Sequence, residues 1–420
     1  MAADTPRARW RQRTAGHALV IAFAVAMAVP AAAPALAQAA PGAAALPGVG
    51  SFGPPDWVKP GTRVSFHGSA AAITGDASTY VEDPNGPWQD PATGKHYSLV
   101  EPTGATTSGG GGDGIRQLDV LAIDGNDVVV SESSYAIDRI NSVFIAPSVS
   151  GGREPGAAAS GAWVSPTWLA QLDPASLGGL LVLRGDFVLD GTTYHAVSLV
   201  RPTPGAYSSD TYDTQTGVLL AEDTQTPDTQ GGLPGSTLLT QTHYIGTRQR
   251  VIPGLGGIDP EWVATTPQLT YSGTEAITNP LVPSAGAMTA PMHVTVTLAP
   301  GGRDWETYTQ DVEVDLAGVT PQHTQTSGAT GTTGIYRWDT ATLATLRPGQ
   351  LIDQDPVTTE RVTVDAVGPG PAGQAVTIAS HKPGIDTRAT YDLATGVLVA
   401  FDESLPVAGT TYSLQLDSLP

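Results

Sequence analysis

The chain repeats itself once, and this internal duplication limits the fold more than any other feature of the sequence. The clearest repeat pairs Tyr212-Asp213 and Thr216-Gly217-Val218-Leu219 with Tyr391-Asp392 and Thr395-Gly396-Val397-Leu398. Two further pairs follow the same order: Pro55-Asp56-Trp57-Val58 with Pro260-Glu261-Trp262-Val263, and segment 169–174 with segment 343–348. Chance similarity between short strands is the alternative. Because all three pairs occur in one order, we expect two copies of one structural unit.

Each copy is expected to be mainly antiparallel sheet, because apolar and polar residues alternate along the chain. Met292, Val294 and Val296, for example, alternate with His293 and Thr295. Such alternation gives a strand one apolar face and one wet face, which is typical of an antiparallel sheet covered on one side. Helix is scarce. One short helix per copy is predicted, at 166–172 and within 338–346, and we expect it to cover the apolar face.

The first 37 residues have the order of parts that is typical of a secretory signal peptide. Four arginines between positions 7 and 13 precede an uncharged apolar run, and Ala35-Leu36-Ala37 supplies a small-x-small cleavage site. We expect a mature chain beginning at Gln38 and an extracytoplasmic location, either secreted or periplasmic. An uncleaved anchor is the alternative. No later stretch is apolar for long enough to span a bilayer, so no transmembrane segment is expected after signal removal.

Changes in composition divide the rest of the chain. Residues 38–55 are Ala, Pro and Gly with almost no charge, which predicts a flexible tether. The duplication predicts a first β domain over 56–253 and a second over 258–420. The first copy is longer, and its surplus falls at 76–114, where abundant Gly, Pro and Asp predict an inserted loop.

Turn chemistry accounts for the repeated motif Tyr-Asp-x-x-Thr-Gly-Val-Leu. Asp213 and Asp392 can accept hydrogen bonds from the backbone two residues on. Gly217 and Gly396 can take the left-handed conformation that closes a bulged hairpin. We interpret these four as structural turn residues, and a ligand role for the two aspartates is the alternative.

The same hairpin resembles one in the lipoprotein-carrier (LolA/LolB-like) superfamily: a strand ending in Tyr-Asp, then x-x-Thr-Gly, then an apolar strand. That superfamily includes periplasmic lipid and lipoprotein binders built as a curved antiparallel half-barrel around a helical plug. Together with the duplication, the resemblance implies a mainly β fold of two tandem, curved, half-barrel-like antiparallel sheets, each with a short covering helix. Segments 57–63 and 238–253 resemble parts of uncharacterised secreted bacterial proteins, a likeness that implies no activity.

Charge and motif content argue against several function classes. The chain carries 20 Lys and Arg against 40 Asp and Glu, a net charge of −20 that repels nucleic acid. It has no cysteine, and therefore no disulfide, thiol nucleophile or thiolate metal site. It contains no Gly-x-Ser-x-Gly elbow and no His-Glu-x-x-His motif, and the acidic stretch 82–90 lacks the full calcium-loop pattern. We expect no metal, no cofactor and no catalytic residue that a motif identifies.

The leading hypothesis is a non-enzymatic extracytoplasmic binding protein that holds a lipid or another apolar ligand in the curve of a sheet. Large apolar residues are the candidate walls of its cleft, with ordinary core packing as the alternative: Phe66, Trp163, Trp168, Leu172, Trp338 and Leu343. Two other classes stay open: a structural or interaction protein of the cell envelope, and a secreted hydrolase with a dispersed site such as a Ser-His-Asp triad. The expected partner is an apolar ligand or an envelope protein, and not nucleic acid.

Overall fold

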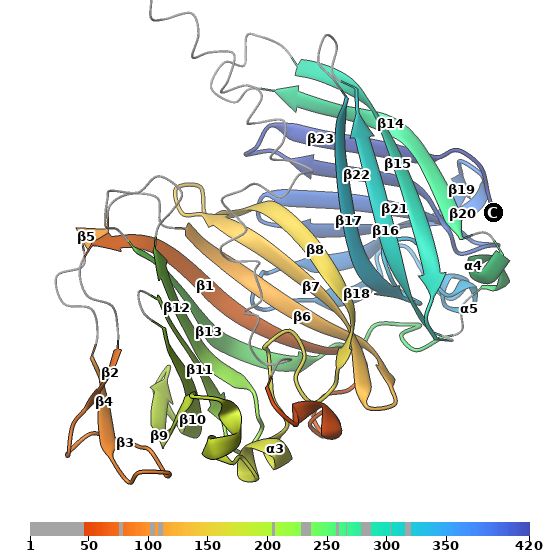
Figure 1. Cartoon of the computed structure of the whole chain (residues 1–420). Coiled ribbons are helices and arrows are strands. Elements are labelled where there is room, and N and C mark those ends of the chain that lie inside the picture. Colours follow the sequence, from red (N-terminus) through yellow and green to blue (C-terminus); the bar gives the residue numbers. More distant parts are fainter. Residues whose placement is uncertain are drawn as a thin grey trace, which may run out of the picture.

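Two open antiparallel sheets account for most of the chain (Figure 1). The computed structural model describes residues 46–74, 79–100, 106–107, 112–203, 206–227, 237–257, 260–265, 267–278, 287–302, 304–315 and 321–420. The predicted signal peptide, 1–37, and the first part of the predicted tether, 38–45, lie outside the described residues.

The first sheet has 13 strands, twelve of them in the continuous order β2-β4-β3-β9-β10-β11-β12-β13-β1-β6-β7-β8, while β5 pairs with β1. Its strands are β1 (Thr62–Thr74), β2 (Thr79–Glu82), β3 (Trp88–Gln89), β4 (His96–Val100), β5 (Thr106–Thr107), β6 (Gly112–Asp124), β7 (Asp127–Asp138), β8 (Val143–Pro155), β9 (Leu181–Leu189), β10 (Thr192–Thr203), β11 (Ala206–Asp213), β12 (Leu219–Pro227) and β13 (Thr237–Gln249).

The second sheet has ten strands in the order β17-β16-β15-β14-β23-β22-β21-β20-β19-β18. Its strands are β14 (Gln268–Thr278), β15 (Ala287–Pro300), β16 (Trp305–Val314), β17 (Gln322–Gly331), β18 (Leu351–Gln354), β19 (Arg361–Gly370), β20 (Gly373–Lys382), β21 (Ile385–Asp392), β22 (Leu398–Leu405) and β23 (Thr410–Leu416).

Nine consecutive strands correspond between the two sheets. The run β9-β10-β11-β12-β13-β1-β6-β7-β8 in the first matches β19-β20-β21-β22-β23-β14-β15-β16-β17 in the second. In both copies the chain enters at mid-sheet, adds three strands toward one edge, passes through a short helix and returns from the opposite edge. The last strand then pairs beside the first, β13 with β1 and β23 with β14. The predicted fold class, mainly β with two tandem antiparallel sheets, is confirmed.

The helices between these strands are shorter than the sequence predicts. They are α3 (Pro166–Ala170), α4 (Glu261–Thr265) and α5 (Thr340–Leu343), with 3-10 turns η2 (Val49–Ser51) and η3 (Pro174–Leu177). Ser165 is the N-cap of α3, but its side chain makes no capping bond. Asp339 does cap α5, since its carboxylate accepts a hydrogen bond from the Thr342 amide. No helix in the described part of the chain is long and apolar enough to cross a membrane.

An indole ties the start of each copy to the repeated hairpin near its end. Nε1 of Trp57 donates to the carbonyl oxygen of Thr216 at 2.7 Å. Nε1 of Trp262 donates to the carbonyl oxygen of Thr395, also at 2.7 Å. The same bond therefore joins the start of the copy to its hairpin in both copies. The two bonded residues are 159 positions apart in sequence in the first copy and 133 in the second.

The two hairpin glycines are required by conformation and by space. Gly217 has φ of +75° and Gly396 has φ of +74°, the left-handed values that the turn chemistry predicts. Each glycine carbonyl also accepts a bond at 2.9 Å from the segment before the covering helix, from the amide of Val164 or of Trp338. A Cβ would lie 1.9 Å from the Val164 oxygen at position 217, and 2.1 Å from the Trp338 oxygen at position 396.

The side chains of the two motif aspartates form hydrogen bonds within the turn. The carboxylate of Asp213 accepts from the amide of Thr216 at 2.8 Å, and that of Asp392 accepts from the amide of Thr395 at 2.8 Å. These bonds replace the backbone pairing that the turn interrupts, as Asp side chains commonly do.

The end of the predicted tether packs on the first copy. Leu46 and Val49 are 4% and 1% exposed, and the indole of Trp168 donates to the carbonyl oxygen of Pro47 at 3.2 Å. The prediction of a flexible segment over 38–55 is therefore wrong from Leu46 onward, because a few apolar side chains suffice to dock this segment.

The predicted inserted loop, 76–114, contains strands in its described residues. β2, β4 and β3 form a small antiparallel extension that reaches β9 through the pair Gln89 and Arg184. Trp88 is buried and its ring meets that of Tyr80 edge to face at 5.8 Å. Trp88 belongs to the core of the first copy and Tyr80 packs against it, so the insertion extends that core, a role that its Gly and Pro content conceals.

The two copies meet where β17 packs against β8 and β7 (Figure 1). A small apolar cluster lies at this contact, with Ala122 and Val129 from the first sheet and Trp305 and Ala329 from the second. The domain limits 56–253 and 258–420 stay a prediction.

We expect Gly217→Val and Gly396→Val to destabilise the protein by similar amounts. Backbone strain alone accounts for about 1–3 kcal/mol, and the Cβ clash with a backbone oxygen adds to it. Gly125→Val is the matched control, because Gly125 has φ of +65° but open space around its Cβ position. In urea unfolding, the free energy of unfolding of Gly125→Val should be well above that of the other two variants. A harmless Gly217→Val beside a severe Gly396→Val would show that the hairpins are not equivalent.

Candidate functional site

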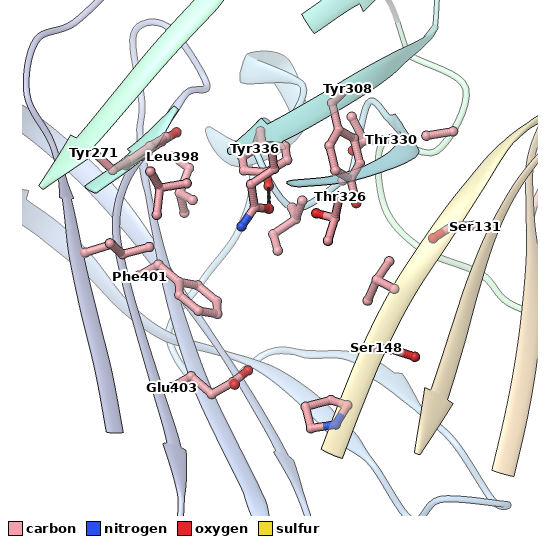
Figure 2. Close-up of a pocket in the computed structure, with 18 of the residues that line it drawn as sticks. Ser131, Ser148, Tyr271, Tyr308, Thr326, Thr330, Tyr336, Leu398, Phe401 and Glu403 are labelled. Atoms are coloured by element: carbon pink, nitrogen blue, oxygen red, sulfur yellow. Dashed lines mark hydrogen bonds between the residues drawn. The ribbon is translucent and has the colours of Figure 1, made fainter. Parts of the chain in front are cut away.

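A cavity of about 370 Å³ lies between the inner face of the second sheet and strands β6, β7 and β8 of the first (Figure 2). Figure 2 shows Ser131 and Ser148 across the cavity from Phe401 and Glu403. The apolar residues of its wall are Leu121, Pro147, Val149, Met292, Val294, Val312, Ala329, Ile335, Leu398, Phe401 and Leu414.

Tyrosines form much of the remaining wall. Tyr271, Tyr308, Tyr336 and Tyr412 all line the cavity, and each is at least nine-tenths buried. The rings of Tyr308 and Tyr336 meet edge to face with centroids 5.1 Å apart. The Tyr336 hydroxyl donates to the side-chain oxygen of Gln310, which fixes that ring against β16.

Buried hydroxyls in the wall, those of Tyr271 and Thr330 among them, lack a partner within the described residues. The Tyr271 hydroxyl and the Thr330 hydroxyl are buried, and neither forms a hydrogen bond there. Burial without a partner raises the pKa of Tyr271 well above its ordinary value. An unpaired buried hydroxyl costs stability, so both groups could gain from a polar atom in the cavity.

Two carboxyls flank Tyr412 on neighbouring strands. Tyr412 on β23 stands in register with Glu275 on β14 and with Glu403 on β22. Burial raises the pKa of Glu403 to about 7, with an opposing influence from Lys382. Burial also raises the pKa of Glu275 to about 7. The inner face of the second copy thus holds two acids whose pKa values are raised toward neutral pH.

Lys382 is already occupied by other groups. Its Nζ donates to the Tyr135 hydroxyl at 2.8 Å and lies 3.2 Å from Glu360. Tyr135 belongs to β7, so this contact is a second bridge between the copies, and Nζ also stands 4.1 Å from the Tyr135 ring centroid.

Charged residues occupy the corresponding face of the first copy. Arg116 donates to Glu132 at 2.9 Å, and its guanidinium lies 5.6 Å from the centroid of the Phe66 ring. Burial raises the pKa of Asp210 to about 6, although Arg201 stands 3.5 Å away. Burial raises the pKa of Glu222 to about 7.

An ionic cluster fixes the second copy against the first beside the cavity. Asp355 is 1% exposed and accepts from three side chains of the first copy: Arg63 at 2.6 Å, Gln117 at 3.0 Å and Arg248 at 3.2 Å. Burial opposes ionisation of Asp355, but the bond to Arg63 and its charge outweigh that effect and lower the pKa well below its ordinary value.

The neighbouring Asp353 completes this cluster. Arg248 binds it with two nitrogens at 2.8 Å, and Arg250 donates to it at 2.8 Å. Arg250 also donates to Asp119 at 2.8 Å, and Asp119 takes two bonds of 2.7 Å from Arg63. Burial opposes ionisation of Asp353, yet the two arginines lower its pKa to about 2. We call Arg63, Arg248, Arg250, Asp119, Asp353 and Asp355 the ionic clamp.

The six cleft residues predicted from the sequence do not line this cavity. Phe66, Trp163 and Trp168 lie in the core of the first copy, and Leu172 packs against it. Trp338 and Leu343 lie in the core of the second copy. Sequence reasoning missed the tyrosines instead, whose only signal is their position on the inward side of alternating strands.

Potential catalytic groups are scattered on the surface. His195 contacts Asp186 at 2.7 Å on an exposed hairpin. Ser272 stands 3.3 Å from His293, with Glu313 next in register. That row lies on the face of the sheet opposite the cavity, since Tyr271 points inward. Within the described residues, no three His, Asp or Glu groups lie close enough to hold a metal ion.

No family model and no curated protein matches the chain. Matches among solved structures include MucB, in a crystal structure of its complex with MucA(peri). That chain is 11% identical with a TM-score of 0.19, and the alignment covers 84% of this chain and 88% of MucB. A TM-score this low supports no assignment of fold or function.

Asp355→Asn should destabilise the protein by about 3–5 kcal/mol, because it leaves buried arginines of the ionic clamp without their counter-charge. Asp365→Asn is the control, since its 3.4 Å pair with Arg388 is largely exposed and should contribute about 1 kcal/mol at most. Urea unfolding measures both. Equal losses of stability in the two variants would show that the ionic clamp is not the main contact between the copies.

The thermal midpoint should be higher at pH 5 than at pH 8. Unfolded Asp and Glu titrate near 4, whereas Asp210, Glu222, Glu275 and Glu403 have raised pKa values of about 6 to 7 in the fold. The folded state therefore holds extra protons, and the stability they give is full below about pH 4 and lost as the pH rises to 7. Asp353 acts oppositely, because its lowered pKa gives stability that is lost only between about pH 4 and 2.

Scanning calorimetry across pH 3 to 8 measures this dependence. A triple variant with Gln at positions 222, 275 and 403 should show a smaller difference between pH 5 and pH 8. An unchanged difference in that variant would assign the effect to other groups.

Proposed function

We propose that this protein is an extracytoplasmic binding protein that holds a ligand with an apolar body in the cavity between its two copies. The observation that carries the proposal is the cavity itself, whose wall combines aliphatic side chains with a few polar groups. Small-molecule sites commonly have this composition and volumes of about 300–1,000 Å³. The cavity volume of about 370 Å³ is at the lower end of that range.

The walls come from rigid elements of both copies. Met292 stands on β15 and Val312 on β16 of the second sheet, and Val149 stands on the edge strand β8 of the first. Asp119 and Arg250 of the ionic clamp also line the cavity. The clamp thus fixes the spacing of the two walls, as a preorganised site requires.

The proposed location rests on the sequence. The basic N-terminal segment, the apolar run and the Ala35-Leu36-Ala37 site support export of the chain. An exported protein that binds an apolar molecule can shield that molecule from water, which is the energetic basis of carrying it.

Thr326→Trp should weaken binding of a neutral apolar dye such as Nile red. Thr326 lines the cavity from β17, so an indole there fills part of the space. Ser327→Trp is the matched control, because its side chain is exposed and successive side chains of a strand point to opposite faces. Fluorescence titration gives the two affinities, and circular dichroism confirms that both variants fold.

Wild-type protein and Ser327→Trp should bind the dye alike, while Thr326→Trp should bind at least about tenfold more weakly, a loss of 1.4 kcal/mol or more. Equal binding by both variants would place the dye elsewhere. Native mass spectrometry of the exported protein is the second test. A clean protein mass together with no dye binding would favour a structural or interaction role in the cell envelope.

A further inference from the structure

We propose that the ligand of this cavity is an organic cation: an amine or quaternary ammonium group carried on an apolar body. The inference rests on the proposed function, because it names the ligand class of the same cavity. It depends on the aromatic side chains of the wall, on the charge balance of the lining and on the field of the whole protein.

The second sheet presents five aromatic rings to one cavity. Tyr271 stands on β14, Tyr308 on β16, Phe401 on β22 and Tyr412 on β23, while Tyr336 follows β17. Figure 2 shows Phe401 and Tyr336 on the same side of the cavity, with Glu403 beyond Phe401. The faces of such rings carry negative electrostatic potential, and groups of them bind ammonium ions by cation–π attraction.

The ionisable side chains of the lining leave one negative charge uncompensated. Asp119 and Arg250 line the cavity but bind each other at 2.8 Å. Glu403 lines it too and forms no ion pair within the described residues. Its nearest cationic influence is Lys382, which Glu360 and Tyr135 already engage. Glu403 is thus the acid that a ligand cation would meet.

The groups around Glu403 favour a cation over an anion. Tyr412 on β23 stands in register with Glu403, and Glu275 on β14 stands in register with Tyr412 on its other side; neither neighbour is a base. A carboxylate or phosphate ligand would enter beside Glu403, and every cation in the described wall is already engaged by an acid. The pKa of Glu403 near 7 means that a bound cation stabilises its ionised form and releases protons near neutral pH.

The unpaired hydroxyls and the overall charge act in the same direction. The oxygens of Tyr271 and Thr330 can accept bonds from an ammonium N–H, which would satisfy two buried groups. The net charge of −20 raises the local concentration of cations near the protein and lowers that of anions. The aliphatic part of the wall then requires an apolar body behind the charged group.

Two probes of nearly equal shape test the proposal: phenyltrimethylammonium and its uncharged carbon analogue, tert-butylbenzene. Calorimetric titration at pH 8 and low salt, with the full mature chain, should show the cation binding at least about tenfold more tightly. The titration repeated in buffers of different ionisation enthalpy should reveal proton release near pH 7.

Glu403→Gln should reduce that preference to about threefold or less. Asp402→Asn is the matched control, because it removes the neighbouring charge from the exposed, opposite face of β22 and should keep the preference. Phe401→Leu keeps an apolar wall but removes a ring. It should weaken binding of the cation more than binding of the neutral analogue.

Equal affinity for the two probes would overturn the cation proposal and leave the proposed binding function standing. Binding of Nile red without binding of phenyltrimethylammonium would do the same. A preference that survives both Glu403→Gln and Phe401→Leu would place the cation outside this wall, which also overturns it. Failure of the dye and of both probes would instead remove the proposed function itself.

Discussion

The relation between the two copies depends on the ionic clamp. Both sheets are open, and Asp353 and Asp355 of the second copy bind arginines of the first. Buried ion pairs add little net stability over an apolar contact, because desolvation offsets the attraction. Their strict geometry excludes alternative arrangements, and here it fixes the inner face of the second copy opposite β6, β7 and β8.

Within each copy, hydrogen bonds at the repeated hairpin join it to the start of the copy and to the segment before the helix. The tryptophan at the start of each copy donates to the hairpin, and the hairpin glycine packs against the segment before the helix. The same bonds occur twice, although one position in the segment before the helix has diverged. Trp163 forms the bridge to Val218 in the first copy, and Arg337 forms the bridge to Val397 in the second. Both side chains are fully buried, and Arg337 binds Glu306 at 2.7 Å.

The inner faces of the two copies have diverged further. In the first copy Arg116 and Glu132 bind each other across that face, so their charges are satisfied by the protein itself. In the second copy tyrosines and Glu403 occupy the face, and hydroxyls such as that of Tyr271 have no partner in the described residues. In the proposed function, the first copy of the duplicated scaffold therefore acts as support while the second forms the binding wall.

The sequence predicts the strands and the hairpins, because residues close together in the chain determine both. Alternation predicts the strands, and the Asp-x-x-Thr-Gly spacing predicts the hairpins with the φ values of Gly217 and Gly396. Local rules do not predict that Leu46 and Val49 dock, because their docking depends on a surface far along the chain. The cavity could not be predicted, since its walls are brought together by pairs such as Arg63 and Asp355, 292 residues apart. Large apolar side chains mark cores, whereas tyrosine suits both a core and a polar wall, so size alone points to the wrong residues.

The cavity and the clamp share residues, and this links the proposed ligand binding to the contact between the copies. Asp119 and Arg250 line the cavity while binding Arg63 and Asp353. A ligand that touches both walls is bound only when the copies are in register, so its binding energy stabilises that register. The converse also holds, because loosening the clamp separates the walls and reduces affinity for any ligand that spans them. Ionisation of the acids on the second wall lowers the free energy of unfolding, whereas ionisation of the clamp aspartates raises it. A cation beside Glu403 would therefore compensate a carboxylate that forms no ion pair in the described part of the chain.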